Sequence, residues 1–379
     1  MRVLADDFHL AQFTNINFRP WWTRYFHLIH RHLLRLLGLQ QPSQYIPHHS
    51  HHLLDLDIGY LLIQTITNGQ MLSETWDEKQ EDPRLQNNLQ RDLARIMLSL
   101  ASIPLPRIGA FRIDHKGYLR LDNRPLSIQG TMQENEGIPL DLPKRKTFSR
   151  VDDFVLHYLD AFDNRFLHQP NAIRDEADAW SQMTGLAVAR SVFPQMFRKE
   201  FNEGPFVYAL TDLHRSNIFV DEGWNVTCII DLEFACSLPV EFLGPPYWLS
   251  GKFVDEMRPK DFEAQYETFV GHVRCAEEEH SHERGMAMES LSSVMKQAWT
   301  SGAYWAKLAL EDPMGFTGVF YYALLPFYFG VTGEDIDDSY YRCFSRLWRP
   351  GVSGILEKKL EERKRYDEQL NAVFAEINE

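Results

Sequence analysis

The feature that most constrains this chain is the stretch Phe206–Ala235, FVYALTDLHRSNIFVDEGWNVTCIIDLEFA. It contains three short apolar runs that predict strands: Phe206–Leu210, Ile218–Val220 and Val226–Ile230. Asp221-Glu222-Gly223 has the composition of a turn between the last two. Asp212 and Asn217 therefore fall on a loop between strands, and Asp231 falls at a strand end.

The spacing Asp-x4-Asn, followed by Asp after a hairpin, points to phosphoryl transfer. That reaction needs a carboxylate to orient the attacking hydroxyl and accept its proton, together with hard oxygen ligands for Mg²⁺. Asp212 would be the base, and Asn217 with Asp231 the metal ligands. Each residue alone is explained as well by satisfying backbone groups in a turn. Their combination at strand ends favours the catalytic interpretation.

Two segments carry a resemblance to a known family, Leu210–Ile218 and Ile229–Ala235. They resemble the pattern His-Gly-Asp-Leu-His-x-x-Asn followed by Ile-Asp-[Trp or Phe]-Glu of the aminoglycoside phosphotransferase and choline kinase branch of the protein-kinase-like fold, particularly its fungal members. More diffuse similarity runs from the apolar run Tyr60–Ile66 through Pro245–Leu249. The resemblance implies an α+β, two-lobed kinase-like fold with a truncated small lobe and a mainly helical large lobe.

The resemblance also implies roles for individual residues. Asp212 matches the catalytic aspartate, and Asn217 and Asp231 match the ligands of Mg²⁺. The backbone of Gln64, Thr65 and Ile66 would contact the adenine of ATP. His214 is expected to be a structural histidine that bonds across the loop. Glu233 is expected to orient the loop, with a position near a second metal ion as the alternative. The expected partners are a nucleotide and a small-molecule acceptor whose identity the sequence leaves open.

The chain departs from this family pattern in two places. Leu210 and Thr211 replace the loop histidine and glycine, although the acid and the metal ligands remain. The first lysine of the chain is Lys79, so no residue before the hinge matches the strand lysine that pairs with the α- and β-phosphates in kinases. Residues 1–59 look like the later part of an amino-terminal lobe, which implies either a gene model that starts late or an eroded kinase. We therefore expect slow transfer, with a pseudokinase or binding module of the same fold as the alternative.

We expect three regions: residues 1–68 as a remnant of the small lobe with an amphipathic helix and a hinge strand, 69–352 as the phosphotransferase lobe, and 353–379 as a charged helix. Tyr60–Ile66 is predicted to be a buried strand, and a hairpin is predicted around Gly117. Further helices are predicted at Leu85–Leu100, Val151–Leu167, Glu176–Phe197, Asp261–Glu279, Met286–Leu310, Gly315–Gly330 and Ser353–Ile377.

The amphipathic stretch Trp21–Leu37 carries three arginines and no acidic residue. A helix of this kind inside a soluble chain usually packs its apolar face, so we favour packing over binding to an anionic membrane. The histidines His48, His49, His51 and His52 lack metal-ligand spacing and predict a solvated loop.

Composition excludes several classes of protein. The formal charge of −14 on 379 residues disfavours nucleic-acid binding. The four cysteines lack CxxC spacing and are too few for a disulfide framework, which favours a reducing, cytoplasmic setting. The first residues have no signal-peptide pattern, and no apolar run has the length of a transmembrane helix.

Overall fold

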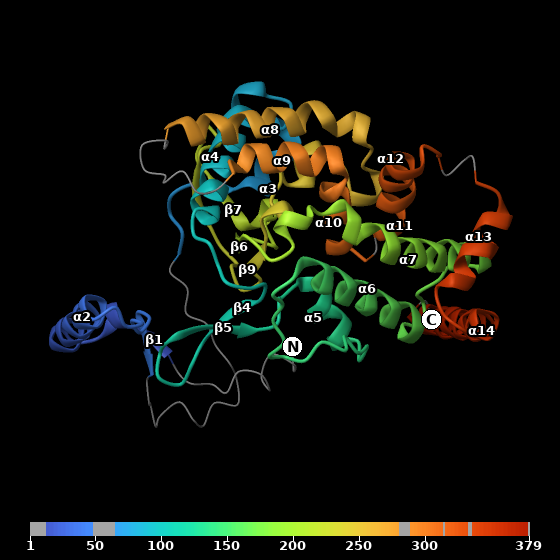
Figure 1. Ribbon diagram of the computed structural model, residues 1–379, viewed down its shortest axis with the longest axis horizontal. Helices are drawn as coiled ribbons and strands as arrows, with labels where there is room; N and C mark the ends of the chain where they lie inside the picture. The colour runs from blue at the N-terminus through green and yellow to red at the C-terminus, as the bar shows by residue number, and fades with distance from the viewer. Residues whose placement is uncertain (1–12, 48–64, 280–288, 314, 333–335, 378–379) are drawn as a thin grey trace.

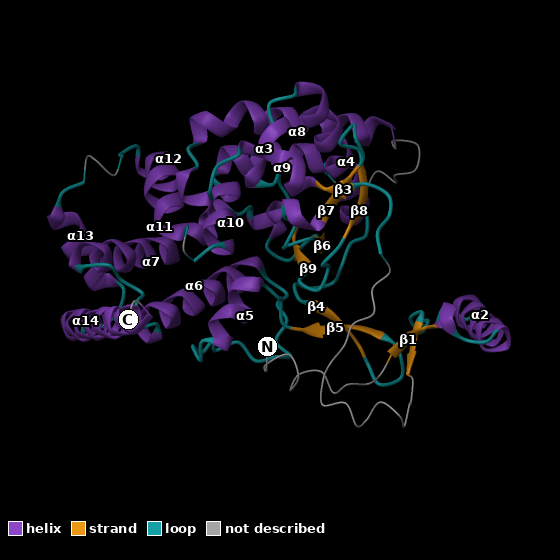
Figure 2. Cartoon of the chain, turned by 180° about the vertical axis from the view of Figure 1, so that it is seen from behind, coloured by secondary structure: helices purple, strands orange, loops and turns teal. Residues whose placement is uncertain are grey.

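The computed structural model describes residues 13–47, 65–279, 289–313, 315–332 and 336–377. Most of these residues form a body of packed helices with small antiparallel sheets on one side (Figure 1, Figure 2). Helix α2 stands away from this body at one end of the molecule (Figure 1). The predicted α+β class is confirmed.

The strands form four small antiparallel sheets. Their pairings are β1 (Phe13–Asn15) with β2 (Tyr45–Pro47), β3 (Gln70–Met71) with β7 (Ile218–Val220) and β7 with β8 (Val226–Ile229), β4 (Ala110–Ile113) with β5 (Leu119–Asn123), and β6 (Phe206–Ala209) with β9 (Cys236–Pro239). The three strands predicted in the Phe206–Ala235 stretch are confirmed, and so is the hairpin at Gly117, whose φ is +84°.

The helices make up the rest of the body. They are α2 (Trp21–Leu36), α3 (Leu72–Lys79), α4 (Pro83–Ala101), α5 (Ile128–Asn135), α6 (Val151–His168), α7 (Glu176–Met196), α8 (Pro259–Glu279), α9 (Leu291–Ser301), α10 (Ala303–Glu311), α11 (Phe316–Val319), α12 (Leu325–Phe329), α13 (Asp338–Phe344) and α14 (Val352–Ile377). A π-helical segment, Phe320–Leu324, joins α11 to α12. Short 3-10 turns lie at Ile16–Phe18, Lys199–Phe201, Arg215–Asn217, Val240–Phe242, Tyr247–Ser250, Val254–Glu256 and Ser345–Leu347.

Helix α4 shows how local sequence sets these boundaries. Asp82 caps its amino terminus by accepting hydrogen bonds from the backbone N–H groups of Arg84 and Leu85, and Pro83 occupies the first turn, where no N–H is needed. Leu89 and Leu93 point into the core, and the helix packs along α8 and against β6. This helix is thereby placed against β6, the strand that leads into the loop with Asp212.

Two predictions about helices need correction. The helix predicted at Met286–Leu310 begins outside the described residues, and its described part, 289–310, forms two helices rather than one, because Gly302 adopts a φ of +84° and ends α9 before α10 begins. The apolar face of the helix at Trp21–Leu37 is not packed, since α2 has no buried residue. The buried helix predicted at Gly315–Gly330 is confirmed for its first part, where Phe316 and Phe320 are almost fully buried.

The predicted strand Tyr60–Ile66 lies largely outside the described residues. Its last two residues, Thr65 and Ile66, have irregular backbone, and the strand begins only at Gln70, so the prediction is wrong for these two positions. Gln64 and the histidines at 48, 49, 51 and 52 also lie outside the described residues. Among the helices that the structure describes, none has the length and apolar character needed to cross a membrane.

Candidate functional site

The loop after β6 brings Asp212 and Asn217 into direct contact. The Asn217 side chain is buried, and its Nδ2 donates hydrogen bonds to the backbone oxygen of Asp212 at 3.0 Å and to Asp212 Oδ2 at 3.3 Å. A single 3-10 turn, Arg215–Asn217, closes the loop between them. The Asp-x4-Asn spacing therefore places the amide beside the carboxylate.

The β7–β8 hairpin returns Asp231 to the same place. The backbone N–H of Ile230 donates to the backbone oxygen of Asn217 at 2.9 Å, so Asp231 follows directly on the residue opposite Asn217. Asp231 is exposed and adopts a left-handed backbone with a φ of +59°, which a short polar side chain tolerates better than most. Asp212 and Asp231 together line a small hollow of about 10 Å³.

The carboxyls of this cluster influence one another. Partial burial raises the pKa of Asp212, and the negative charge of Asp231 adds to that effect, while His214 and Asn217 act in the opposite direction. Partial burial also raises the pKa of Glu233, and a hydrogen bond shared with Asp231 raises it further. The site thus gathers negative charge that a cation or a proton would stabilise.

The donor atoms fit a magnesium ion. Asn217 uses its Nδ2 on Asp212, which leaves the amide oxygen Oδ1 as the acceptor of that side chain. Together with the exposed Asp231 carboxylate it offers hard oxygens, the ligand type that Mg²⁺ takes alongside substrate phosphates and water. Within the described residues, no group of three or more His, Cys, Asp or Glu side chains is arranged to hold a metal. An ion here would therefore take its remaining ligands from nucleotide and water.

Three buried tryptophans, Trp76, Trp224 and Trp248, pack together beneath the Asp212 loop on its core side. Trp76 stacks on Trp224 with ring centroids 5.5 Å apart and meets Trp248 edge to face at the same separation. Trp248 Nε1 donates a 2.7 Å hydrogen bond to the backbone oxygen of Leu213, the residue after Asp212. The guanidinium of Arg215 lies 5.1 Å from the centre of the Trp76 ring. The loop thus packs on a cluster of three tryptophans, which the sequence did not reveal.

Thr211 gives the loop a second anchor. Its Oγ1 donates a 2.6 Å hydrogen bond to the backbone oxygen of Phe234, which lies just beyond Asp231 and Glu233. The residue that departs from the glycine of the family pattern therefore ties the two acid-bearing segments together. A hydroxyl at this position was visible in the sequence, but its partner 23 residues away was not.

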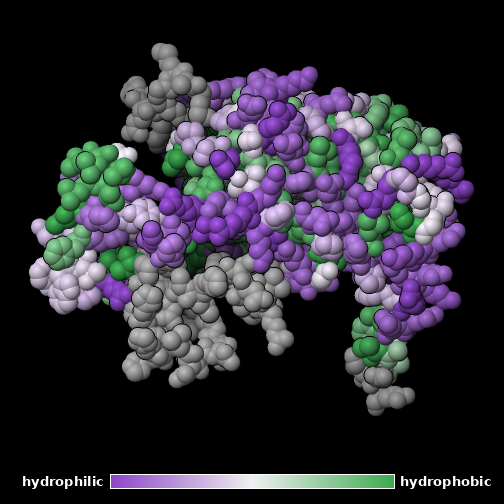
Figure 3. All heavy atoms as spheres, turned by 60° about the horizontal axis from the view of Figure 1, so that its bottom comes forward, coloured by the Kyte–Doolittle hydropathy of each residue, from purple (hydrophilic) through white to green (hydrophobic). Residues whose placement is uncertain are grey.

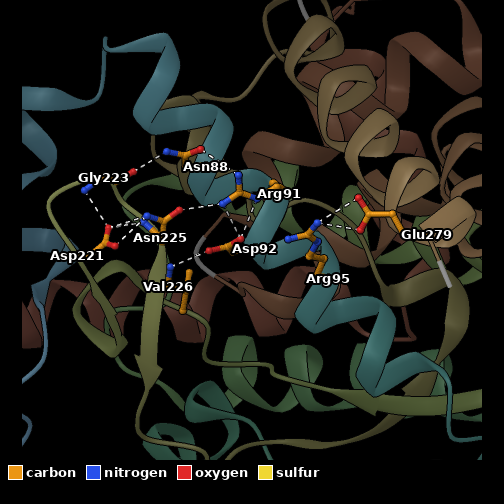
Figure 4. Close-up of polar contacts among 9 residues, drawn as sticks. All are labelled: Asn88, Arg91, Asp92, Arg95, Asp221, Gly223, Asn225, Val226 and Glu279. Atoms are coloured by element: carbon orange, nitrogen blue, oxygen red, sulfur yellow. Dashed lines mark hydrogen bonds and ion pairs between the residues drawn. The ribbon is translucent and has the colours of Figure 1, made fainter.

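A polar clamp fixes the β7–β8 hairpin to α4 (Figure 4). The hairpin turn is bound by Asn88 Nδ2, which donates to the backbone oxygen of Gly223 at 2.9 Å, and by Asp92 Oδ2, which accepts from the N–H of Val226 at 3.0 Å. Arg91 Nη2 adds a 2.8 Å bond to Asn225 Oδ1. The hairpin that carries Asp231 is therefore positioned by a helix more than a hundred residues earlier in the chain.

The other predicted site residues lie as follows. His214 is exposed, and its Nδ1 contacts Ser216 Oγ at 3.2 Å, so its hydrogen bond stays within the loop. Although the residue is exposed as a whole, partial loss of solvent around its ring lowers the pKa of His214, and the neighbouring Arg215 lowers it further. Thr65 is exposed and Ile66 half-buried, and both precede β3, which pairs with β7. The predicted adenine-contacting segment thus leads into the sheet that carries the loop.

A larger hollow of about 100 Å³ lies behind the loop. Leu210, Thr211 and Leu213 line it from the loop side, and apolar residues of α4 form the opposite wall. Its charged members are Lys307 and Glu311, whose Nζ and Oε2 atoms form a 2.7 Å ion pair. Burial raises the pKa of Glu311, and the charge of Lys307 opposes that shift.

Comparison with known proteins gives one match. The model of the phosphotransferase enzyme family matches residues 24–242, which is more than half of the 379 residues and includes the loop, the hairpin and Asp231. No curated protein and no solved structure matches the chain. The chain therefore belongs to the phosphotransferase enzyme family and has its kinase-like α+β fold.

Proposed function

We propose that this protein transfers the γ-phosphoryl group of ATP to a hydroxyl of a small molecule. The observation that carries the proposal is the contact of Asp212 with Asn217 beside Asp231 at the ends of β6, β7 and β8. In this arrangement Asp212 orients the acceptor hydroxyl and takes its proton. Its raised pKa makes it a better proton acceptor than an ordinary aspartate, provided that it is ionised at the working pH.

Asn217 and Asp231 would hold Mg²⁺, which when bound neutralises charge on the phosphates. Asn217 also fixes Asp212 through its two hydrogen bonds, so it acts as a positioning residue as well as a ligand. Glu233 shares a hydrogen bond with Asp231 and would keep that carboxylate in place. Each role belongs to a residue that the loop or the hairpin already positions.

The test is a transfer assay with a panel of small-molecule alcohols, ATP and Mg²⁺, read by mass spectrometry as the gain of one phosphoryl group on the acceptor. We expect turnover by the unmodified chain and none by Asp212→Asn. Glu222→Gln, an exposed carboxylate on the hairpin turn, is the matched control and should retain turnover. Full turnover by Asp212→Asn would contradict the proposed base.

A nucleotide-binding module without transfer is the second candidate. It is favoured by the absence of any lysine from residues 13–47 and from 65–78 among those described. Binding of ATP with Mg²⁺ and no phosphorylated product from any acceptor would support this candidate over the first.

We also propose that the chain works in the cytoplasm and is organised as residues 1–68, 69–352 and 353–379. The four cysteines are free, which supports a reducing compartment. The last of these regions corresponds to most of α14, which is held on the body by Lys359 Nζ and Arg363 Nη1, donors to the backbone oxygens of Gln169 and Ile173.

A further inference from the structure

Residues 13–47 form an arm that projects from the body. The arm leaves through β1, contains α2, and returns through β2 (Figure 1, Figure 2). It meets the β4–β5 hairpin, where Ser43 N donates to Gly117 O at 2.7 Å and Gln40 Nε2 donates to Leu119 O at 2.8 Å. Helix α2 is thereby held at the far end of a hairpin, away from the packed helices.

The orientation of α2 is the reverse of that expected for an amphipathic helix in a folded protein. Its polar side faces the returning chain, since Arg31 Nη1 donates to Pro42 O at 2.6 Å and His27 Nε2 lies 3.1 Å from Ser43 O. The apolar side faces outward, with Trp22 53%, Phe26 69% and Leu36 70% exposed. Apolar side chains gather on this projecting helix at the left of Figure 3.

Such a surface indicates an interaction site. Large apolar side chains scattered singly are common on proteins, but a contiguous set of aromatic and aliphatic residues on one helix is not. The exposed members of this set on α2 are Trp21, Trp22, Tyr25, Phe26, Leu28, Ile29, Leu33 and Leu36. The arm leaves them uncovered by any described part of the chain.

The charge of the arm indicates which kind of partner covers the apolar face of α2. Residues 13–47 contain four arginines and no aspartate or glutamate, although the whole chain has a net charge of −14. Neither Arg24 nor Arg35 forms an ion pair with a described residue, and both lie on the side of α2 away from Trp22. A cationic helix with tryptophan, phenylalanine and leucine on its apolar face matches the chemistry of helices that lie in the interface of an anionic bilayer.

We propose that α2 docks on the surface of an anionic phospholipid bilayer, with its apolar face inserted at the headgroup boundary. Trp21 and Trp22 lie at the start of the helix, and tryptophan prefers the interface between lipid headgroups and acyl chains. A second copy of this chain would bring two arginine-bearing helices together, which like-charge repulsion disfavours. The cytoplasmic leaflet carries the negative surface potential that attracts such a helix.

The test is sedimentation of the 379-residue chain with vesicles of phosphatidylcholine alone or of phosphatidylcholine with phosphatidylserine. We expect binding to the anionic vesicles, weakened by added salt. The double variant Trp22→Ser/Phe26→Ser should lose binding. Phe253→Ser, which changes an aromatic that is 74% exposed outside the arm, should bind like the unmodified chain. The double variant Arg24→Gln/Arg35→Gln should weaken binding by about fivefold for each arginine.

Light scattering on the same samples without vesicles tests the alternative that a second copy of this chain covers α2. A dimer that Trp22→Ser/Phe26→Ser converts to a monomer, with no vesicle binding by the unmodified chain, would show that α2 pairs with a second copy and would overturn the proposal. Equal binding by the control and by Trp22→Ser/Phe26→Ser would also overturn it. Because all the substituted residues are exposed, loss of fold is checked by circular dichroism, which should be unchanged.

Discussion

Replacing Trp248 with phenylalanine tests whether the cluster of Trp76, Trp224 and Trp248 holds the loop. The substitution keeps an aromatic ring against Trp76 but removes the Nε1 donor that binds the backbone oxygen of Leu213 at 2.7 Å. Leu213 is half-buried, so water replaces the lost donor only in part. We expect Trp248→Phe to destabilise the fold and to loosen the residue next to Asp212.

Trp76→Phe is the matched control for this change. Trp76 is also buried and belongs to the same cluster, but its Nε1 is buried without a hydrogen-bond partner among the described residues. Both substitutions remove the same ring volume, so the cavity effects largely cancel. The lost hydrogen bond at Trp248 should cost about 1 to 2 kcal/mol, whereas removing an unpaired buried donor at Trp76 should recover part of the loss in packing.

The assay is equilibrium unfolding in urea, with free energies compared at the same pH and salt. We expect Trp248→Phe to lose about 1 to 2 kcal/mol more than Trp76→Phe. Equal losses, or a larger loss for Trp76→Phe, would refute the claim that the indole N–H holds the loop. Amide exchange at residues 210–217 should be faster in Trp248→Phe alone.

Three further predictions concern residues around the site. Thr211→Val should cost about 1 kcal/mol in urea unfolding while Thr211→Ser costs less, because only serine keeps the hydroxyl that donates to the Phe234 backbone oxygen; equal costs would contradict that bond. Asp92→Ala should lower the free energy of unfolding by about 1 to 3 kcal/mol, since Asp92 accepts a hydrogen bond from a backbone N–H of the hairpin. Arg95→Ala should lower it by less than about 1 kcal/mol, because Arg95 forms an exposed ion pair. The reverse order in thermal or urea unfolding would contradict the role of Asp92 in holding the hairpin. Burial raises the pKa of Glu241 from 4.5 to about 7. The protonated carboxyl therefore adds to the free energy of unfolding of the protein at low pH, and this contribution is lost as the pH rises from the unfolded pKa through 7. The unmodified chain should therefore lose about 2 to 3 kcal/mol relative to Glu241→Gln between pH 5 and pH 8, and a constant difference across this range would contradict the raised pKa.

Local sequence patterns predicted much of the body because they depend on neighbours in the chain. The apolar spacing from Leu85 to Leu100 predicted α4, although not its start at Pro83, and Gly117 predicted the turn between β4 and β5. The strands around the loop were predicted for the same reason. Periodicity alone did not reveal the break at Gly302, because apolar residues continue on both sides of it.

The sequence predicted the acidic and amide residues of the candidate site, but not the tertiary contacts that hold them in place. Asp212 and Asn217 lie close in the chain, so their contact follows from a short loop. The contacts of Trp248 with Leu213 and of Asp92 with Val226 join residues far apart in the sequence, and no local pattern reports such pairings. The direction of the apolar face of α2 also depends on a tertiary partner, which is why the packed helix that its periodicity indicated was the wrong prediction.

If Asn217 and Asp231 hold a metal ion, as we propose, nucleotide binding depends on that ion. Isothermal titration of the 379-residue chain with ATP, with and without Mg²⁺, tests it most directly when repeated on Asp231→Ala and on the control Glu222→Ala. We expect binding that requires Mg²⁺, is lost in Asp231→Ala and is unchanged in Glu222→Ala. Binding of equal affinity without Mg²⁺, or binding that survives in Asp231→Ala, would contradict it.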